Sequence, residues 1–141
     1  MMRAANDVAD VLGGFTLFAD LPRPRLEAAT HAFDEQMYTQ GQRILRSGFA
    51  GSGFHVILEG EAAVMIEDEE RARLSKGDFF GEISMLLDEP PAADVVALGP
   101  LRCLTIAGPD LERFLLEHPT VMLRLLQAEA RRLRGAIRWQ S

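Results

Sequence analysis

The sequence predicts a mainly β domain, an eight-stranded jelly-roll-like β-barrel with helices before and after it. Two observations lead to this fold class. Between residues 31 and 107, glycines or charged residues interrupt short apolar runs about every ten residues, which is typical of an all-β sandwich or barrel. In residues 1–30 and 108–141, apolar side chains recur at helical spacings instead. With 141 residues, 48% of them hydrophobic, the chain is long enough for one core, and we expect a single domain over residues 1–141.

The N-terminal part is expected to form short helices around a loop. Val8, Val11 and Leu12 make one short apolar stripe. Pro22 opens a second helical segment that contains Leu26, because proline suits the first turn of a helix.

The barrel strands are expected where apolar runs lie between turn residues. These runs lie near residue 38 and at residues 43–45, 54–58, 63–66, 71–74, 95–98 and 101–106. Between the fourth and fifth runs, Glu67-Asp68-Glu69-Glu70 is interpreted as a solvated acidic turn.

The C-terminal part returns to helix. Pro109-Asp110 precedes one apolar pattern, and a longer one follows Pro119. The longer pattern consists of Val121, Met122, Leu125, Leu126, Leu133, Ala136 and Ile137. Within it, the stripe of Met122, Leu125, Leu126, Leu133 and Ile137 either packs on its own barrel or forms a two-helix seam with a second copy of the chain.

Charge is distributed unevenly along the chain. Residues 1–117 carry a net charge of −10, while residues 118–141 carry +4 from Arg124, Arg131, Arg132, Arg134 and Arg138 against Glu129. An acidic body repels polyanions, and arginines near a helix C-terminus suit the helix macrodipole. We therefore expect no direct contact with nucleic acid.

The sequence also lacks targeting signals. No apolar run reaches the roughly 18 residues that a membrane helix needs, and the first residues carry charge where a signal peptide would be apolar. We expect a cytoplasmic protein with no membrane contact. The 14 arginines against one lysine favour a bacterial source with a GC-rich genome.

No residue pattern predicts catalysis or metal binding. Cys103 lies in an apolar run and is expected to be a buried, inert thiol. His31, His55 and His118 are isolated, so we expect surface or half-buried histidines and no metal of the kind that cupin barrels bind. With no Ser-His-Asp order and no close carboxylate pair, we expect neither an enzyme nor a cofactor.

One stretch carries a functional signal, residues 77–98. Within it, residues 81–86 are expected to form a single helical turn between two strands. Such a turn presents unpaired backbone N–H groups to an anion, while Glu82 can accept hydrogen bonds from hydroxyl groups. A phosphate joined to a sugar suits this arrangement.

Here the chain resembles the cyclic nucleotide-binding domains of bacterial transcription regulators, cyclic-nucleotide-dependent kinases and gated channels. The resemblance covers nearly the whole chain. It rests on Leu17-Phe18-Ala19-Asp20-Leu21, the turn at Gly41, residues 53–61, the run Phe80-Gly81-Glu82, and the closing helix after Glu117-His118-Pro119. It implies the effector-domain barrel of the catabolite-activator type, a phosphate-binding cassette over residues 79–95, and cyclic AMP or cyclic GMP as the ligand.

The resemblance assigns roles within the first half of the cassette. Glu82 matches the carboxylate that binds the ribose 2′-hydroxyl. The backbone amides around Ile83 and Ser84, after Gly81, match those that face the cyclic phosphate.

The second half of the cassette departs from the family. Pro91, followed by Ala92, stands nine residues after Glu82, where the family has its phosphate-binding arginine, and Asp94 replaces a common serine or threonine. Arginine pairs with a phosphate through two charge-assisted bonds, whereas proline has neither charge nor N–H. Losing one partner of a buried charge pair costs about 2–5 kcal/mol. We therefore expect weak binding of cyclic nucleotide or none.

Other residues bear on the pocket less directly. Four cations on the barrel are candidates to replace the missing arginine: Arg46, Arg71, Arg73 and Lys76. The family covers the base with its closing helix, where this chain has Arg132, Leu133 and Ala136, which are equally suited to helix packing or dimer contacts. Phe54 and Phe80 are interpreted as core residues rather than base-stacking rings.

The leading hypothesis is a stand-alone regulatory module that acts through protein partners or by dimerisation through its C-terminal helix. The alternative is a sensor of cyclic nucleotide or another small effector with a non-standard phosphate contact. A third hypothesis, a transcription regulator, requires a helix-turn-helix domain after Ser141; we expect none if the chain ends there naturally. The fourth, a cupin-like metalloenzyme, lacks its histidines.

Overall fold

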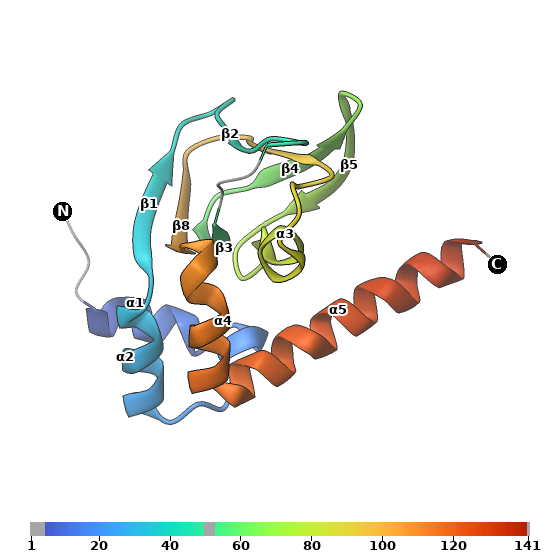
Figure 1. Ribbon diagram of the computed structural model, residues 1–141. Coiled ribbons are helices and arrows are strands. Elements are labelled where there is room, and N and C mark those ends of the chain that lie inside the picture. The colour runs from blue at the N-terminus through green and yellow to red at the C-terminus, as the bar shows by residue number, and fades with distance from the viewer. Residues whose placement is uncertain (1–4, 50–52, 141) are drawn as a thin grey trace.

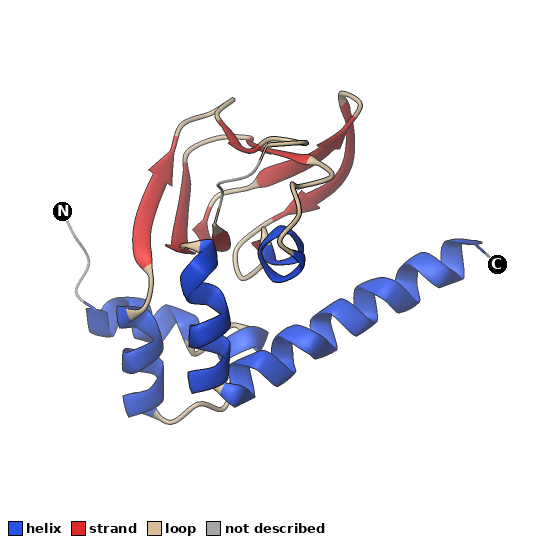
Figure 2. Ribbon diagram, in the orientation of Figure 1, coloured by secondary structure: helices blue, strands red, loops and turns tan. Residues whose placement is uncertain are grey.

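The computed structural model describes residues 5–49 and 53–140, with side chains for residues 8–49 and 53–137, so the Arg138 side chain of the basic tail lies outside the described part. The predicted fold class is confirmed: eight strands in the described residues form a barrel above a group of helices (Figure 1, Figure 2). The helices are α1 Ala5–Leu12, the 3-10 turn η1 Thr16–Phe18, α2 Arg23–His31, α3 Glu82–Leu87, α4 Gly108–Glu117 and α5 Pro119–Gln140. The strands are β1 Asp34–Tyr38, β2 Arg43–Leu45, β3 Phe54–Glu59, β4 Ala62–Ile66, β5 Glu69–Leu74, β6 Phe79–Phe80, β7 Asp94–Ala97 and β8 Leu101–Ile106.

The strands form two antiparallel sheets of four. One sheet has the order β1-β8-β3-β6 and the other β2-β7-β4-β5. In the first sheet, Cys103 of β8 lies opposite Gln36 of β1 and Ile57 of β3. Because β6 belongs to the first sheet and β7 to the second, the segment that joins them, which includes α3, crosses from one sheet to the other.

The β4–β5 connection corrects one sequence prediction. Glu67 and Asp68 both have positive φ, +54° and +64°, and these two residues alone close the hairpin. Glu69 and Glu70 already belong to β5, where Glu70 accepts a hydrogen bond from Arg73. The prediction of a four-residue acidic turn is therefore wrong, since a two-residue turn of this type is enough.

Two apolar clusters hold the fold together. The first joins the helices to the β1-β8-β3-β6 sheet, and Phe33 is at its centre, with ring centroids 5.1 Å from Phe114 and 6.3 Å from Phe18 and Phe54. The second fills the barrel and includes Ile57, Phe80, Leu101 and Cys103. The burial predicted for Phe54, Phe80 and Cys103 is confirmed, and burial raises the pKa of the Cys103 thiol to about 12.

The apolar contacts that anchor the long helix α5 to the helical cluster lie in its N-terminal half. Val121 and Leu125 are buried in the helical cluster, and Arg124 donates hydrogen bonds to Asp20 and to the Thr16 carbonyl, both at 3.2 Å. The C-terminal half then extends away from the helical group, as Figure 1 shows. No helix in the described residues is long and apolar enough to cross a membrane.

Candidate functional site

The candidate site starts where β6 turns into α3. Gly81 has φ +92°, and a Cβ there would collide with the carbonyl oxygen of Gly53, so the close approach of β6 to the start of β3 requires glycine. This turn lets α3 begin directly at Glu82. The first turn of a helix leaves backbone N–H groups without intrahelical acceptors, so α3 presents such groups at Ile83 and Ser84.

The first three side chains of α3 alternate between the interior and the surface. Glu82 is 2% exposed and Ser84 is also buried, whereas Ile83 is 57% exposed. Ser84 Oγ donates to the Glu89 carbonyl at 2.5 Å, and the Glu89 N–H donates to the Ser84 carbonyl at 3.2 Å. The Ser84 hydroxyl is thus used to close the loop after α3.

The buried Glu82 carboxylate meets an arginine from α5. Arg132 donates to Glu82 Oε1 at 2.9 Å, to Glu129 Oε1 at 3.0 Å and to the Phe79 carbonyl at 3.3 Å. Its guanidinium carbon also lies 4.4 Å from the centre of the Phe79 ring. Two residues 50 positions apart in the sequence therefore meet at the carboxylate that the family uses for ribose.

Burial governs the charge of Glu82. Loss of hydration, with a smaller effect of the nearby Glu129 carboxylate, raises the pKa of this carboxyl to about 8 even though Arg132 acts to lower it. Within the described residues, Glu82 Oε2 is buried without a hydrogen-bond partner. A carboxyl in this environment binds a proton near neutral pH, and it could donate that proton as well as accept hydrogen bonds.

The second half of the cassette is fastened to the loop after β2. The carbonyl of the buried Pro91 accepts the Gly48 N–H at 2.9 Å. Asp94 accepts the Ser47 N–H at 2.6 Å and faces Arg43 Nε at 3.5 Å. Pro91 and Asp94, which depart from the family's pattern, therefore have structural partners in this chain, while Ala92 is exposed.

The candidate substitute cations lie in different surroundings. Arg71 and Arg73 on β5 form ion pairs with Glu69 at 3.5 Å and Glu70 at 3.0 Å. Lys76 is exposed in the turn between β5 and β6. Arg46 is exposed two residues before Gly48, so it is the cation nearest in sequence to the loop that binds Pro91.

The closing helix contributes one of its three predicted residues to the site. Arg132 reaches Glu82, but Leu133 is 62% exposed and Ala136 is exposed. The contact of Arg132 with Glu82 and Phe79 could not be found from the sequence, because no local pattern pairs residues that are so distant in the chain.

His55, on β3 beside β6, is a second feature that sequence reasoning missed. It is 3% exposed, its Nδ1 lies 2.9 Å from the Gly53 carbonyl, its Nε2 lies 3.2 Å from Tyr38 Oη, and its ring stacks on Phe80 at 4.7 Å. Burial lowers its pKa to about 4, against a smaller opposing effect of the Gly53 carbonyl. The prediction of a surface or half-buried residue is wrong for His55, while His31 is exposed and His118 half-buried as predicted.

Comparison with known proteins gives the same family for sequence and fold. The family model described as "Cyclic nucleotide-binding domain" matches residues 35–118. The catabolite activator protein of Thermus thermophilus is 28% identical, with a TM-score of 0.77 over 86% of this chain and 59% of that one. Domain CBD2 of a PKA regulatory subunit, bound to Sp-2Cl-cAMPS, is 20% identical, with a TM-score of 0.78 over 94% of this chain and 90% of that one.

A further match is the regulatory subunit of a cAMP-independent protein kinase A from Trypanosoma brucei, 22% identical, with a TM-score of 0.78 over 89% of this chain and 46% of that one. A mutant of that subunit with three substitutions, one of them threonine to arginine, is bound to cAMP in its A site and matches with a TM-score of 0.77. The chain thus spans about half the length of the Thermus and Trypanosoma proteins.

Proposed function

Because this chain belongs to the cyclic nucleotide-binding domain family, we propose that it is a regulatory module whose cassette has lost strong affinity for cyclic nucleotides and that acts through protein partners or dimerisation. The family is regulatory rather than enzymatic. The observation that carries the proposal is Pro91, which replaces the phosphate-binding arginine and is buried, with its carbonyl bonded to Gly48.

Loss of the arginine weakens the binding of the phosphate group. Without the arginine, a cyclic phosphate would meet only the backbone N–H groups at the start of α3. Loss of a buried charge partner costs about 2–5 kcal/mol, roughly 30-fold to several-thousand-fold in affinity. A micromolar site would become millimolar.

The Arg132 contact supports the same proposal. Glu82, the residue that matches the family's ribose ligand, is already hydrogen-bonded to Arg132 and almost fully buried. A sugar hydroxyl would have to displace this arginine or share the carboxylate with it. At Oε1, ribose binding therefore competes with an existing charge-assisted hydrogen bond, which leaves the buried Oε2 as the other acceptor of this carboxylate.

The trypanosome protein offers a parallel. It is described as cAMP-independent, and a mutant with three substitutions, one of which introduces arginine, is bound to cAMP. By analogy, a single arginine at position 91 is the change most suited to test this chain.

The alternative is a sensor whose phosphate contact comes from elsewhere. It is favoured by Gly81 and Glu82, which match the family's motif, and by Arg46, which is exposed two residues before the Gly48 that binds Pro91. In this alternative, cyclic AMP or cyclic GMP would bind the unmodified chain at micromolar concentration.

A thermal-shift titration separates the two functions. The unmodified chain, Pro91→Arg and the matched control Pro90→Arg are titrated with cyclic AMP and cyclic GMP to millimolar concentration. A ligand at 100 times its Kd stabilises the folded state by about 2.7 kcal/mol, which raises Tm by several degrees. We expect a rise for Pro91→Arg only; Pro90→Arg adds the same charge at an exposed neighbouring residue.

Two results would contradict this expectation. A rise for the unmodified chain at micromolar nucleotide would establish the sensor alternative. An unchanged Tm for all three proteins would mean that the absent arginine is not the cause of the lost affinity.

Dimerisation through α5 is the second part of the proposal. One stripe of α5, Leu123, Leu126, Ala130, Leu133 and Ile137, follows the alternating three- and four-residue spacing of a coiled-coil seam. All five residues are exposed, and the four larger ones are 52–64% exposed. The stripe lies away from the buried Val121 and Leu125, so it is available to a second copy of the chain.

A further inference from the structure

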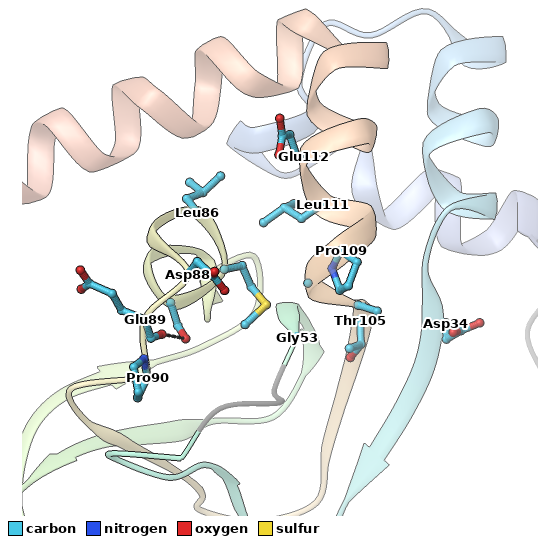
Figure 3. A pocket seen from close by; sticks show the side chains of 14 residues that line it. Asp34, Gly53, Leu86, Asp88, Glu89, Pro90, Thr105, Pro109, Leu111 and Glu112 are labelled. Carbon is cyan, nitrogen blue, oxygen red and sulfur yellow. Dashed lines mark hydrogen bonds between the residues drawn. The ribbon is translucent and has the colours of Figure 1, made fainter.

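A gap between α3 and α4 adjoins the cassette: Ser84 and Glu89 contribute to its lining, whereas Glu82 does not. It has a volume of about 920 Å³, and it opens on the side of α3 that faces α4 (Figure 3). Met85 of α3 meets α4 at Gly108, where a Cβ would collide with the Met85 sulfur. The two helices are therefore in contact at one end of the gap.

The gap has an apolar floor. Leu86 and Leu111 point into it from α3 and α4, and Pro109 lies beside them (Figure 3). Leu111 is 1% exposed, but Leu86 is 48% exposed, which is a large apolar surface for a helix of six residues. Leu116 shares the α4 face of Pro109 and Glu112 by helical spacing and is 65% exposed, so the apolar surface continues along α4.

The rim of the gap is acidic. Asp88 lies at the end of α3 and Glu112 lies on α4, whereas the carboxylates of Glu89 and of Asp34 on β1 are turned away from the gap (Figure 3). The described residues that line the gap include no arginine, lysine or histidine. The charge of this surface is therefore negative on both sides of an apolar floor.

We propose that this gap is a docking groove for a basic amphipathic helix of a partner protein. The inference rests on the proposed function, because it names the class of partner through which the module acts. Leucine-like side chains of such a helix would cover the exposed Leu86 and Leu116, and its lysines or arginines would lie beside Asp88 and Glu112. Since α4 has ten residues and a helix rises 1.5 Å per residue, the groove matches about three turns of a docked helix.

The charge of the chain supports this occupant over an acidic or neutral one. Residues 1–117 carry a net charge of −10, so a basic helix is attracted to the whole body as well as to the rim. An acidic helix would meet like charges on both sides of the groove. Helices that dock in grooves use apolar anchors three and four residues apart, which is the pattern that the floor accommodates.

The test uses a 14-residue peptide of leucine and lysine with an amphipathic helical pattern, and a counterpart with glutamate in place of lysine. Binding to the isotope-labelled full chain is followed by fluorescence anisotropy and by NMR. We expect the basic peptide to bind with amide shifts concentrated in α3 and α4, and the acidic peptide not to bind.

Matched variants locate the binding surface. We expect Asp88→Asn with Glu112→Gln to weaken binding about threefold to tenfold, as for two exposed ion pairs, and Leu86→Ala to weaken it about fivefold. Asparagine suits residue 88, whose φ is +54°. The controls are Glu61→Gln with Asp68→Asn, and Ile66→Ala; both alter exposed residues on the β4–β5 side of the barrel and should change affinity little.

Three results would overturn the inference: no binding, binding of both peptides alike, or an equal loss in the control variants, which would indicate general attraction to an acidic protein. The nucleotide titration is independent of these results. If neither the basic peptide nor the nucleotide binds, the groove proposal fails and the proposed function stands. If the unmodified chain binds both the nucleotide and the basic peptide, the proposed function fails and the groove proposal stands.

Discussion

Arg132 makes contacts of three kinds with the cassette, although it comes from a helix that otherwise leaves the body. It donates to the Glu82 carboxylate and the Phe79 carbonyl, it covers the Phe79 ring, and it also donates to Glu129 on its own helix. Of the two carboxylates only Glu82 is deeply buried, so its ion pair with Arg132 is the less screened by water. The contact therefore fixes both the direction of α5 and the state of Glu82.

We expect Arg132→Ala to lower the free energy of unfolding by about 1–2 kcal/mol, from the lost charged hydrogen bonds and ring contact. Because the pKa of Glu82 is raised to about 8, its neutral form is favoured by folding, and stability falls as the pH rises from about 4.5 to 8. Without Arg132 that pKa rises further, so the variant should lose more stability at pH 8 than at pH 6. Urea unfolding at both pH values measures these changes in the free energy of unfolding, and Arg131→Ala, at an exposed neighbouring residue, is the control. An equal loss of stability in the two variants would contradict the prediction.

His55 gives stability the opposite pH dependence. Its pKa is about 4 when folded and 6.5 as a model value, so the unfolded chain binds the proton more readily. The neutral imidazole therefore contributes to the free energy of unfolding above about pH 6.5, and this contribution is lost as the pH falls towards 4. At 1.36 kcal/mol per pKa unit, the total loss is about 3 kcal/mol. Urea unfolding between pH 4.5 and 7 gives the free energy of unfolding at each pH. Plotted against pH, this free energy should rise less steeply for His55→Gln than for the unmodified chain. The exposed His31→Gln should keep the original slope, and a His55→Gln slope equal to it would contradict the assignment.

At the scale of elements, the strands and helices were predictable where local sequence determines them. Regular apolar runs between turns predicted the central strands, and the stripe of Val8 and Leu12 predicted α1, in which both residues are buried. The two-residue strand β6 is too short to give a pattern of its own. It exists because His55 and Val56 of β3 pair with it.

The candidate site was predictable only in part, for the same reason. Glu82, Ser84 and Pro91 lie in one segment, so a linear motif could identify them as candidates. The burial of His55 depends on Tyr38 and Phe80, and the Glu82 contact depends on a helix 50 residues later. Such contacts are set by how the elements pack, which one sequence does not reveal.

At the scale of the whole molecule, the chain divides into an acidic body and a basic, projecting helix. The body presents the α3–α4 groove, and α5 presents the stripe of Leu123, Leu126, Ala130, Leu133 and Ile137. These surfaces lie on different elements, so a second copy and a partner helix could bind at the same time. Occupation of one surface need not exclude the other.

The α5 stripe leads to a prediction about the assembly. Four large apolar side chains that are each more than half exposed are costly in water, and pairing two such helices buries them together. We expect light scattering after gel filtration to give twice the 15.6 kDa mass of one chain, and Leu126→Glu with Leu133→Glu to give a single chain's mass, because the charges would lie in the seam. Gln127→Glu adds charge on the same helix outside the stripe and should remain a dimer. A single chain's mass for the unmodified protein, or a dimer that survives both substitutions, would rule out the α5 seam and leave partner binding as the route of action.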